Sequence, residues 1–147
     1  MVLKYPSIGD KPLLFVHVED VATGNRTLFP MLLDTGADET CFPASYAAYF
    51  GHNNLAPEVS KKSIHGVGGE AQAYIHSVRL VLIDPEKSTK KAFVPVWSST
   101  LCKATFVSSL DMTMGLLGRD VMVEWQNISF APVPHRASSK WDITIRI

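Results

Sequence analysis

The sequence predicts a mainly β protein with one or two short helices, folded as a single domain of 147 residues. Short runs rich in β-branched and aromatic residues recur along the chain, and glycine, proline and asparagine separate them. The final run, KWDITIRI, alternates strictly, which places Trp141, Ile143, Ile145 and Ile147 on one face of a predicted strand. Strands at this spacing are typical of a sandwich or a closed β domain, and the chain is long enough for one core.

The first predicted unit is a β-hairpin. LLFVHVED at residues 13–20 forms its first strand, ATGNR forms the turn, and TLFPMLL at residues 27–33 forms the returning strand. Pro30 inside the second strand indicates either a bulge or an edge position. Asp34 then follows directly after the apolar end of this strand.

One helix and a second hairpin are expected next. FPASYAAYFGHN predicts a helix, with Pro43 at its first position and Gly51 at its cap. The segment from Val59 to Asp84 predicts two strands joined by HGVGGE, with a long returning arm. The remaining predicted elements are strands at KAFVPVW, TFVSS and NISFAP, and a short helix at GRDVMVEW.

Composition and charge narrow the classes of function. Lys plus Arg and Asp plus Glu number 14 each, so no basic surplus favours nucleic acid or an anionic membrane as a partner. No apolar run approaches the roughly 18 residues of a membrane helix, and no signal peptide is evident, so we expect a cytoplasmic protein. Cys41 and Cys102 form no C-x-x-C pair, and we interpret both as reduced thiols.

Three segments stand out, and each has an ordinary structural explanation. LLDTGADET is also consistent with a turn that closes a strand, and IHGVGGE with a flexible hairpin tip. GLLGRDVM is also consistent with a buried strand that ends at a glycine before a helix. A phosphate loop is unlikely at GVGG because no Gly-Lys-Ser/Thr follows it.

Taken together and in this order, the three segments closely resemble the retropepsin-like aspartic proteases, the family of the retroviral proteases. Leu32 and Leu33 precede Asp34-Thr35-Gly36-Ala37, a glycine-rich segment follows some thirty residues later, and Leu116-Leu117-Gly118-Arg119 comes near the end. The resemblance covers roughly residues 10–130. It implies a retropepsin-like closed β domain, one half of an acid protease. Residues at about 133–147 extend beyond the compact viral domain, and we expect them to form a C-terminal extension strand of the same single domain.

The activity implied by the resemblance is that of an aspartic endopeptidase. Two carboxylates that share one proton can activate water and protonate the departing amine without metal or cofactor. The chain contains one Asp-Thr-Gly, so the second Asp34 would come from an identical chain in a homodimer. The sequence contains neither H-E-x-x-H nor G-x-S-x-G, and its five histidines are scattered.

The resemblance also implies a role for each residue of the site. Asp34, Thr35 and Gly36 would be catalytic, and Arg119 would form a buried ion pair with Asp38. An extended peptide substrate would lie as an added strand between the floor and a glycine-rich flap. The residues expected to bind it are Ala37, Asp38, Gly66, Val67, Gly68, Gly69 and Leu116.

Two functions other than an active endopeptidase are possible for this sequence, and some residues depart from the family's pattern. A catalytically weak or inactive peptide-binding module of the same fold would not need the intact Asp34, and a plain β interaction domain would leave Asp38 and Arg119 unexplained. His65 and Glu70 make the flap more polar than in familiar viral enzymes, and Asp120 stands where a neutral amide is familiar.

The C-terminal run is expected to help hold the dimer, because an apolar terminal strand left as an exposed edge needs a partner. Packing on its own domain as an ordinary last strand is the alternative.

Overall fold

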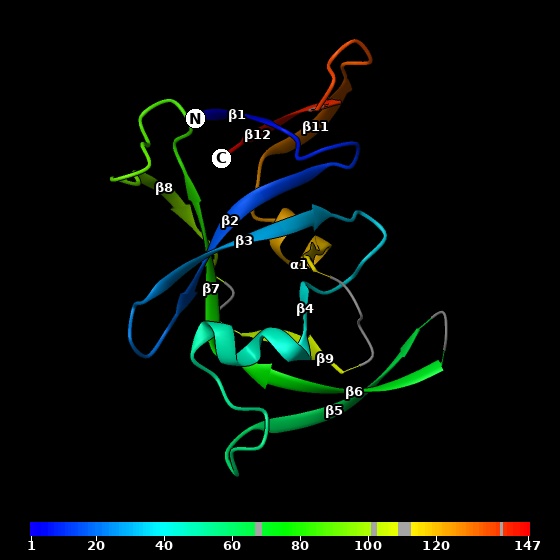
Figure 1. Cartoon of the computed structure of the whole chain (residues 1–147). Coiled ribbons are helices and arrows are strands. Elements are labelled where there is room, and N and C mark those ends of the chain that lie inside the picture. The colour runs from blue at the N-terminus through cyan, green and yellow to red at the C-terminus, as the bar shows by residue number, and fades with distance from the viewer. Residues whose placement is uncertain (67–68, 101–102, 109–112, 139) are drawn as a thin grey trace.

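The computed structural model describes residues 1–66, 69–100, 103–108, 113–138 and 140–147, and within them the chain forms two sheets. The mainly β class is confirmed (Figure 1). The larger sheet has nine strands in the order β5-β6-β9-β4-β10-β3-β2-β7-β8, and the smaller has the order β1-β12-β11. In Figure 1 the small sheet lies above the large one, and the β5–β6 hairpin projects from the opposite end.

The first hairpin forms as predicted. β2 (Leu13–Asp20) and β3 (Arg26–Leu33) pair in one unbroken antiparallel register, from Leu13 opposite Leu32 to Glu19 opposite Arg26. β10 (Gly115–Leu117) joins the other side of β3 only from Met31 onward. Pro30 therefore sits where β3 has no second neighbour among the described strands, so of the two interpretations the edge position is correct.

The predicted helix begins later than expected. Residues Cys41–Pro43 form strand β4, which pairs with β10 and with β9 (Ala104–Val107). The helix η1 is a 3-10 helix at Ala44–Phe50, so Pro43 precedes it instead of occupying its first position. Gly51 caps it as predicted, with a left-handed φ of 85° that a side chain would strain.

The second hairpin also forms, but its returning arm is two strands. β5 (Ser60–Gly66) pairs with β6 (Gly69–His76), and β7 (Val78–Ile83) then leaves the hairpin and pairs with β2. β8 (Pro95–Ser98) is shorter than the KAFVPVW run that predicted it. A four-residue helix, α1 (Arg119–Met122), follows β10.

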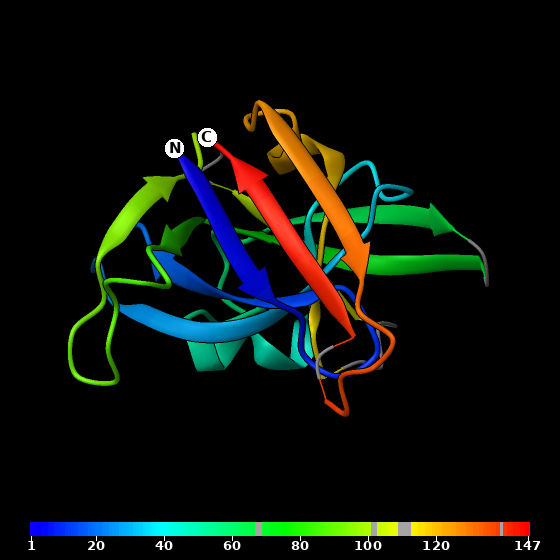
Figure 2. The same ribbon diagram turned by 90° about the horizontal axis from the view of Figure 1, so that it is seen from above.

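The small sheet shows that the C-terminal strand packs within its own domain. β12 (Trp141–Arg146) lies in the middle, between β11 (Asn127–Pro132) and the unpredicted β1 (Val2–Pro6), as Figure 2 shows. Both edges of β12 are thus paired within its own chain, as in the alternative of an ordinary last strand, and a part for β12 in holding a dimer stays a prediction. Ile143 and Ile145 are fully buried, so this strand belongs to the core of its own domain.

Four phenylalanines organise the core around η1. Phe42 stacks on Phe106 with ring centroids 5.1 Å apart, and Phe29 and Phe50 meet Phe42 at 5.8 and 5.3 Å. All four are buried, and stacked and edge-to-face contacts between aromatic rings stabilise the core beyond the area that the rings bury. The cluster fixes η1 against β3, β4 and β9, the strands that lead into the site.

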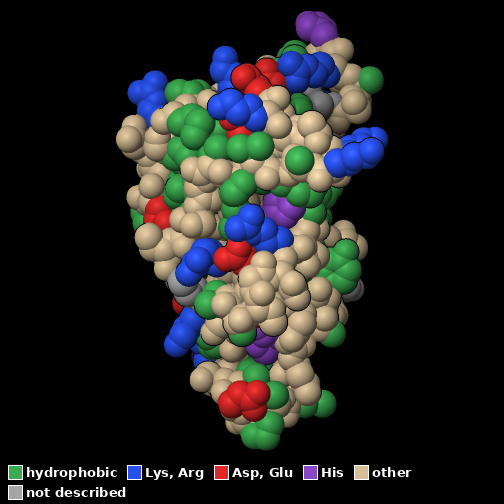
Figure 3. Space-filling view, turned by 90° about the vertical axis from the view of Figure 1, so that its left-hand side faces the viewer, with side chains coloured by type: hydrophobic (Ala, Val, Ile, Leu, Met, Phe, Trp, Pro, Cys, Tyr) green, Lys and Arg blue, Asp and Glu red, His purple; other side chains and the backbone are tan. Residues whose placement is uncertain are grey.

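The surface shows mixed charge. On the face in Figure 3, basic, acidic and hydrophobic side chains alternate, in keeping with the equal numbers of acidic and basic residues. Within the described part of the chain, no helix combines the length and the apolar character that crossing a membrane requires.

Candidate active site

Asp34 is placed by two parallel strands. β3 and β10 run side by side with Leu33 opposite Leu117, and both leucines are buried. Immediately beyond them, the Asp34 N–H donates to the Leu117 carbonyl at 3.1 Å. The apolar pairs of the two motifs therefore anchor the strand ends, and Asp34 emerges where β3 stops.

The Asp-Thr-Gly segment forms a tight turn around the Asp34 carboxylate. The Gly36 N–H donates to Asp34 Oδ1 at 2.9 Å, and the Ala37 N–H donates to the Asp34 carbonyl at 3.1 Å. Asp34 is half-buried, whereas Thr35 and Gly36 are exposed. The segment is thus both a turn that closes strand β3 and a loop that presents a carboxylate to solvent.

The loop after β10 packs directly on the Asp34 loop. The Arg119 N–H donates to the Ala37 carbonyl at 2.9 Å, and the Asp120 N–H donates to the Asp38 carbonyl at 3.2 Å. Gly118 makes this approach possible, because a Cβ there would lie only 2.5 Å from the Glu39 carbonyl carbon. The glycine of the Leu-Leu-Gly-Arg motif is therefore explained by close backbone contact.

Arg119 and Asp38 form the ion pair that the resemblance implied, but the pair is exposed in the single chain instead of buried. The Arg119 guanidinium contacts the Asp38 carboxylate. The two side chains are 57% and 82% exposed in the single chain, so the expectation of a buried pair is wrong for it. Both side chains lie at the surface, and Asp38 lines the same cleft as Asp34.

Sequence reasoning missed the buried polar contact that holds the two loops together. The Asp120 carboxylate accepts the Thr40 N–H at 2.9 Å and the Thr40 hydroxyl at 2.7 Å. Thr40 Oγ1 in turn accepts the Gly118 N–H at 3.0 Å, and Thr40 is 1% exposed. The signal for this contact in the sequence is the acid at position 120, which stands where a neutral amide is familiar.

Asp34 lies in a cleft of about 730 Å³ between its loop and the β5 strand of the flap hairpin. Four other predicted residues, Gly36, Ala37, Asp38 and Leu116, line the same cleft. Gly66 and Gly69 pair at the end of the hairpin, while Val67 and Gly68 lie outside the described residues. The further lining residues are Glu39, Cys41, Lys62, Ser63, Ile64, His65, Thr105 and Val107.

Cys41 lies in the cleft as a free thiol, and Cys102 lies outside the described residues. Burial, together with the nearby carboxylates of Asp120, Glu39 and Asp34, raises the pKa of Cys41 to about 11. A thiol that stays protonated is a poor nucleophile and a poor metal ligand. No group of three or more His, Cys, Asp or Glu side chains in the described ranges is arranged to hold a metal ion.

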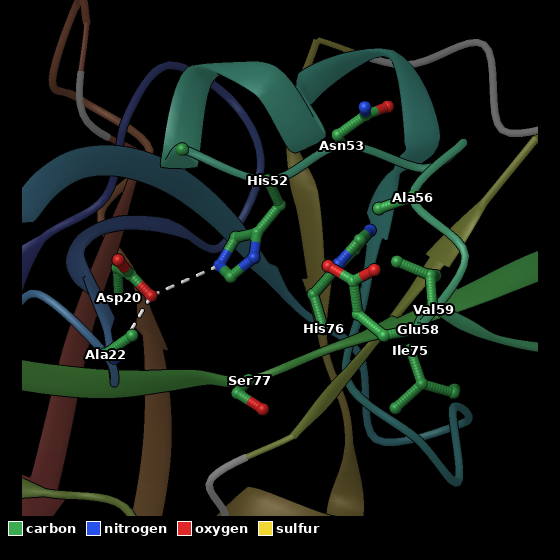
Figure 4. Close-up of a pocket in the computed structure, with 11 residues that line it drawn as sticks. Asp20, Ala22, His52, Asn53, Ala56, Glu58, Val59, Ile75, His76 and Ser77 are labelled. Atoms are coloured by element: carbon green, nitrogen blue, oxygen red, sulfur yellow. Dashed lines mark hydrogen bonds and ion pairs between the residues drawn. The ribbon is translucent and has the colours of Figure 1, made fainter.

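A second pocket, of about 460 Å³, contains a histidine pair. Figure 4 shows His52 between Asp20 and His76, and its Nε2 lies 3.5 Å from Asp20 Oδ1. The His52 and His76 rings are 4.7 Å apart, and His76 Nε2 lies 2.7 Å from Asn54 Oδ1. Burial, with His52 nearby, lowers the pKa of His76 to about 4. Asp34 does not line this pocket.

The fold and the Asp34 site together define the class of retropepsin-like aspartic proteases. Comparison of the chain with known protein families agrees with this class. The family described as retroviral aspartyl protease matches residues 9–128, so the chain belongs to that family. No curated protein sequence matches the chain.

Among the solved structures that share the fold are two proteases. A retropepsin-like aspartic protease from Rickettsia conorii is 15% identical, with a TM-score of 0.56 over 97% of this chain and 98% of that one. The EIAV protease in complex with the inhibitor HBY-793 is 20% identical, with a TM-score of 0.50 over 78% of this chain and 88% of that one. The retropepsin-like fold predicted from the three motifs is confirmed.

Proposed function

We propose that the protein is an aspartic endopeptidase that acts as a homodimer, with one Asp34 from each chain. The observation that carries this proposal is the solvent-accessible Asp34 carboxylate on the floor of a cleft, in the only Asp-Thr-Gly of the chain. The exposed Thr35, Asp38 and Arg119 around it support a second copy seated on this surface. Family membership supports the reaction class.

The two carboxylates would divide the proton transfers between them. Like charges at close range do not both ionise, so one Asp34 is held protonated and the other is ionised, as in the aspartic proteases generally. The ionised carboxylate takes a proton from water as the water attacks the peptide carbonyl, and the protonated one supplies a proton for the departing amine. The chain's part is to hold each carboxylate through the Gly36 N–H, and to hold the Asp34 backbone through the hydrogen bond from its N–H to the Leu117 carbonyl.

An extended peptide would lie in the cleft between the Asp34 loop and the flap hairpin. The first flap strand, β5, has only β6 as a neighbour among the described strands, so one of its edges is free. Addition of a peptide strand would supply backbone hydrogen bonds, and alternate side chains would enter the cleft.

The test is digestion of a peptide library by the purified protein between pH 4 and pH 7, with Asp34→Asn as the inactive variant. We expect wild type to cleave and Asp34→Asn to lose at least about 10³-fold in rate, because a carboxamide can neither take a proton from water nor supply one to the departing amine. Asp10→Asn, an equal change at an exposed aspartate away from the cleft, should cleave normally.

Two results separate the alternatives. Peptide binding without cleavage by wild type would favour the inactive binding module over the enzyme. Loss of cleavage in the presence of a metal chelator would contradict the aspartic mechanism, which uses no metal.

A further inference from the structure

An ion pair forms part of the wall of the cleft. Lys62 Nζ, on strand β5, lies 2.6 Å from Glu39 Oε2 on the loop after Asp34. The Thr105 hydroxyl donates to the same oxygen at 3.1 Å. These hydrogen bonds, that from Lys62 first, lower the pKa of Glu39, so its carboxylate stays charged. Glu39, Lys62 and Thr105 all line the cleft that contains Asp34.

The pair has hydrogen-bonding capacity left over. Both bonds to Glu39 end on Oε2, and Oε1 accepts no hydrogen bond from the described residues. The Lys62 ammonium carries three N–H donors, of which one points to Glu39. The side chains of Glu39 and Lys62 are 55% and 36% exposed. A bound molecule would therefore meet an acceptor and a donor side by side.

Apolar residues share the cleft with the pair and with polar residues such as Ser63 and His65. Ala37, Cys41, Ile64, Val107 and Leu116 line the same cleft. A side chain that fits such a pocket has an aliphatic stem, which packs on these residues, and a polar head that reaches Glu39 and Lys62.

The polar head that complements both members is a carboxamide. A cationic head is attracted by Glu39 but repelled by Lys62. An anionic head is attracted by Lys62 but repelled by Glu39. A primary amide carries no charge, donates through its NH₂ to the carboxylate and accepts through its carbonyl from the ammonium. We propose that the Glu39–Lys62 pair selects a glutamine, or the shorter asparagine, at one position of the bound peptide. This inference rests on the proposed peptide substrate.

The experiment compares peptides that carry Gln, Lys, Glu or Met at each position near the cleaved bond. At one position we expect wild type to favour Gln over the other three by about fivefold or more in kcat/KM, the effect of one or two hydrogen bonds. Glu39→Gln leaves the Lys62 ammonium without its negative partner, so the preferred substrate residue at that position should become Glu. Lys62→Gln leaves Glu39 unbalanced, so the preference there should move to Lys.

Two controls belong to the design. The double variant Glu39→Lys with Lys62→Glu restores the pair with reversed polarity and should recover the Gln preference. Arg26→Gln disrupts a pair of equal length, 2.6 Å to Glu19 on the first hairpin, and should leave every preference unchanged.

Several outcomes would overturn the inference. Unchanged preferences in both single variants would do so, as would an equal loss on all peptides, since that would make the pair a structural tie only. If wild type cleaves nothing, the proposed function fails, and the same peptides are then titrated onto Asp34→Asn. Tighter binding of the Gln peptide, lost in both charge variants, would still support the selection, and equal affinities would contradict it.

Discussion

Two neighbouring residues, Arg119 and Asp120, contribute unequally to the site. Arg119 forms an exposed pair with Asp38, and exposed pairs contribute little because water competes for both partners. Asp120 is half-buried and accepts hydrogen bonds from both the N–H and the hydroxyl of Thr40, which is itself buried. The conspicuous arginine of the motif is thus less important for the folded chain than the acid after it.

We therefore expect Asp120→Ala and Arg119→Ala to differ in stability. Asp120→Ala should lower the free energy of unfolding by about 2–3 kcal/mol, because it leaves buried donors without an acceptor. Arg119→Ala should lower it by about 1 kcal/mol or less in the isolated chain. Urea unfolding at low protein concentration measures both, with Arg146→Ala as an exposed control. Equal losses would show that the Arg119 pair is shielded from solvent.

The difference between these residues shows where sequence reasoning reaches its limit. The Asp34 and Gly118 motifs could be identified because their residues lie close together in the chain. The contact between Thr40 and Asp120 spans 80 positions, and nothing local to either residue predicts it.

Among the elements, those with a clear local pattern were predicted and those that depend on distant partners were not. β12 shows the alternation of a strand in its own sequence, and β2 is a run rich in β-forming residues that ends at a turn. β4 is three residues long, and it exists because β9 and β10 flank it. β1 ends at a proline and is a strand only because β12 pairs with it. Such strands follow from tertiary pairing, which overrides local propensity.

His76, the last residue of β6, is expected to make the stability of the fold depend on pH. The pKa of His76 in the fold is about 4, below its ordinary value of 6.5. Between these values the unfolded chain binds a proton that the folded chain does not, so stability is full above about pH 6.5 and falls as the pH drops toward 4. His76 is 4% exposed, and the shift corresponds to a loss of up to about 3 kcal/mol.

Chemical unfolding at several pH values checks this expectation. His76→Gln should flatten the slope between pH 6.5 and pH 4, whereas His135→Gln, at an exposed site, should not. An unchanged slope in His76→Gln would assign the acid sensitivity to other groups, such as the buried His17, whose pKa burial also lowers. Because the proposed dyad needs a proton, catalysis and stability would make opposite demands at acidic pH.

Strand β12 supports the domain itself, so its removal should do more than loosen a dimer. Deletion of residues 140–147 takes away Ile143 and Ile145, both fully buried, and the partner of β1 and β11. Each lost core isoleucine typically costs about 2–5 kcal/mol, against a total stability of about 5–15 kcal/mol.

We expect the truncated chain to lose its fold, as judged by the dispersion of its NMR amide signals. Thr144→Ala, a change on the less buried face of β12, should leave the spectrum dispersed. If the truncated chain folds, the small sheet is not required for the fold. Strand β12 would then be a candidate for a contact between two chains.

At the scale of the whole molecule, the chain carries half of the proposed site and no net charge to oppose self-association. With β12 paired within the chain, β1 and β11 form the edges of the small sheet among the described strands. A second chain could add to either edge, or seat on the exposed residues around Asp34.

Mixing wild type with Asp34→Asn tests whether two chains share one site, without any assumption about where they touch. If chains exchange freely, an equal mixture contains mixed dimers with a single functional carboxylate, and these should be inactive. The activity of a fixed amount of wild type should then fall to about half on addition of an equal amount of Asp34→Asn, because only about a quarter of all dimers are wild type on both sides. Addition of Asp10→Asn in the same amount should instead raise the activity, since its dimers remain complete. Undiminished activity in the Asp34→Asn mixture, under conditions where chain exchange is demonstrated by labelled chains, would mean that each chain works alone and that the single Asp34 acts without a partner.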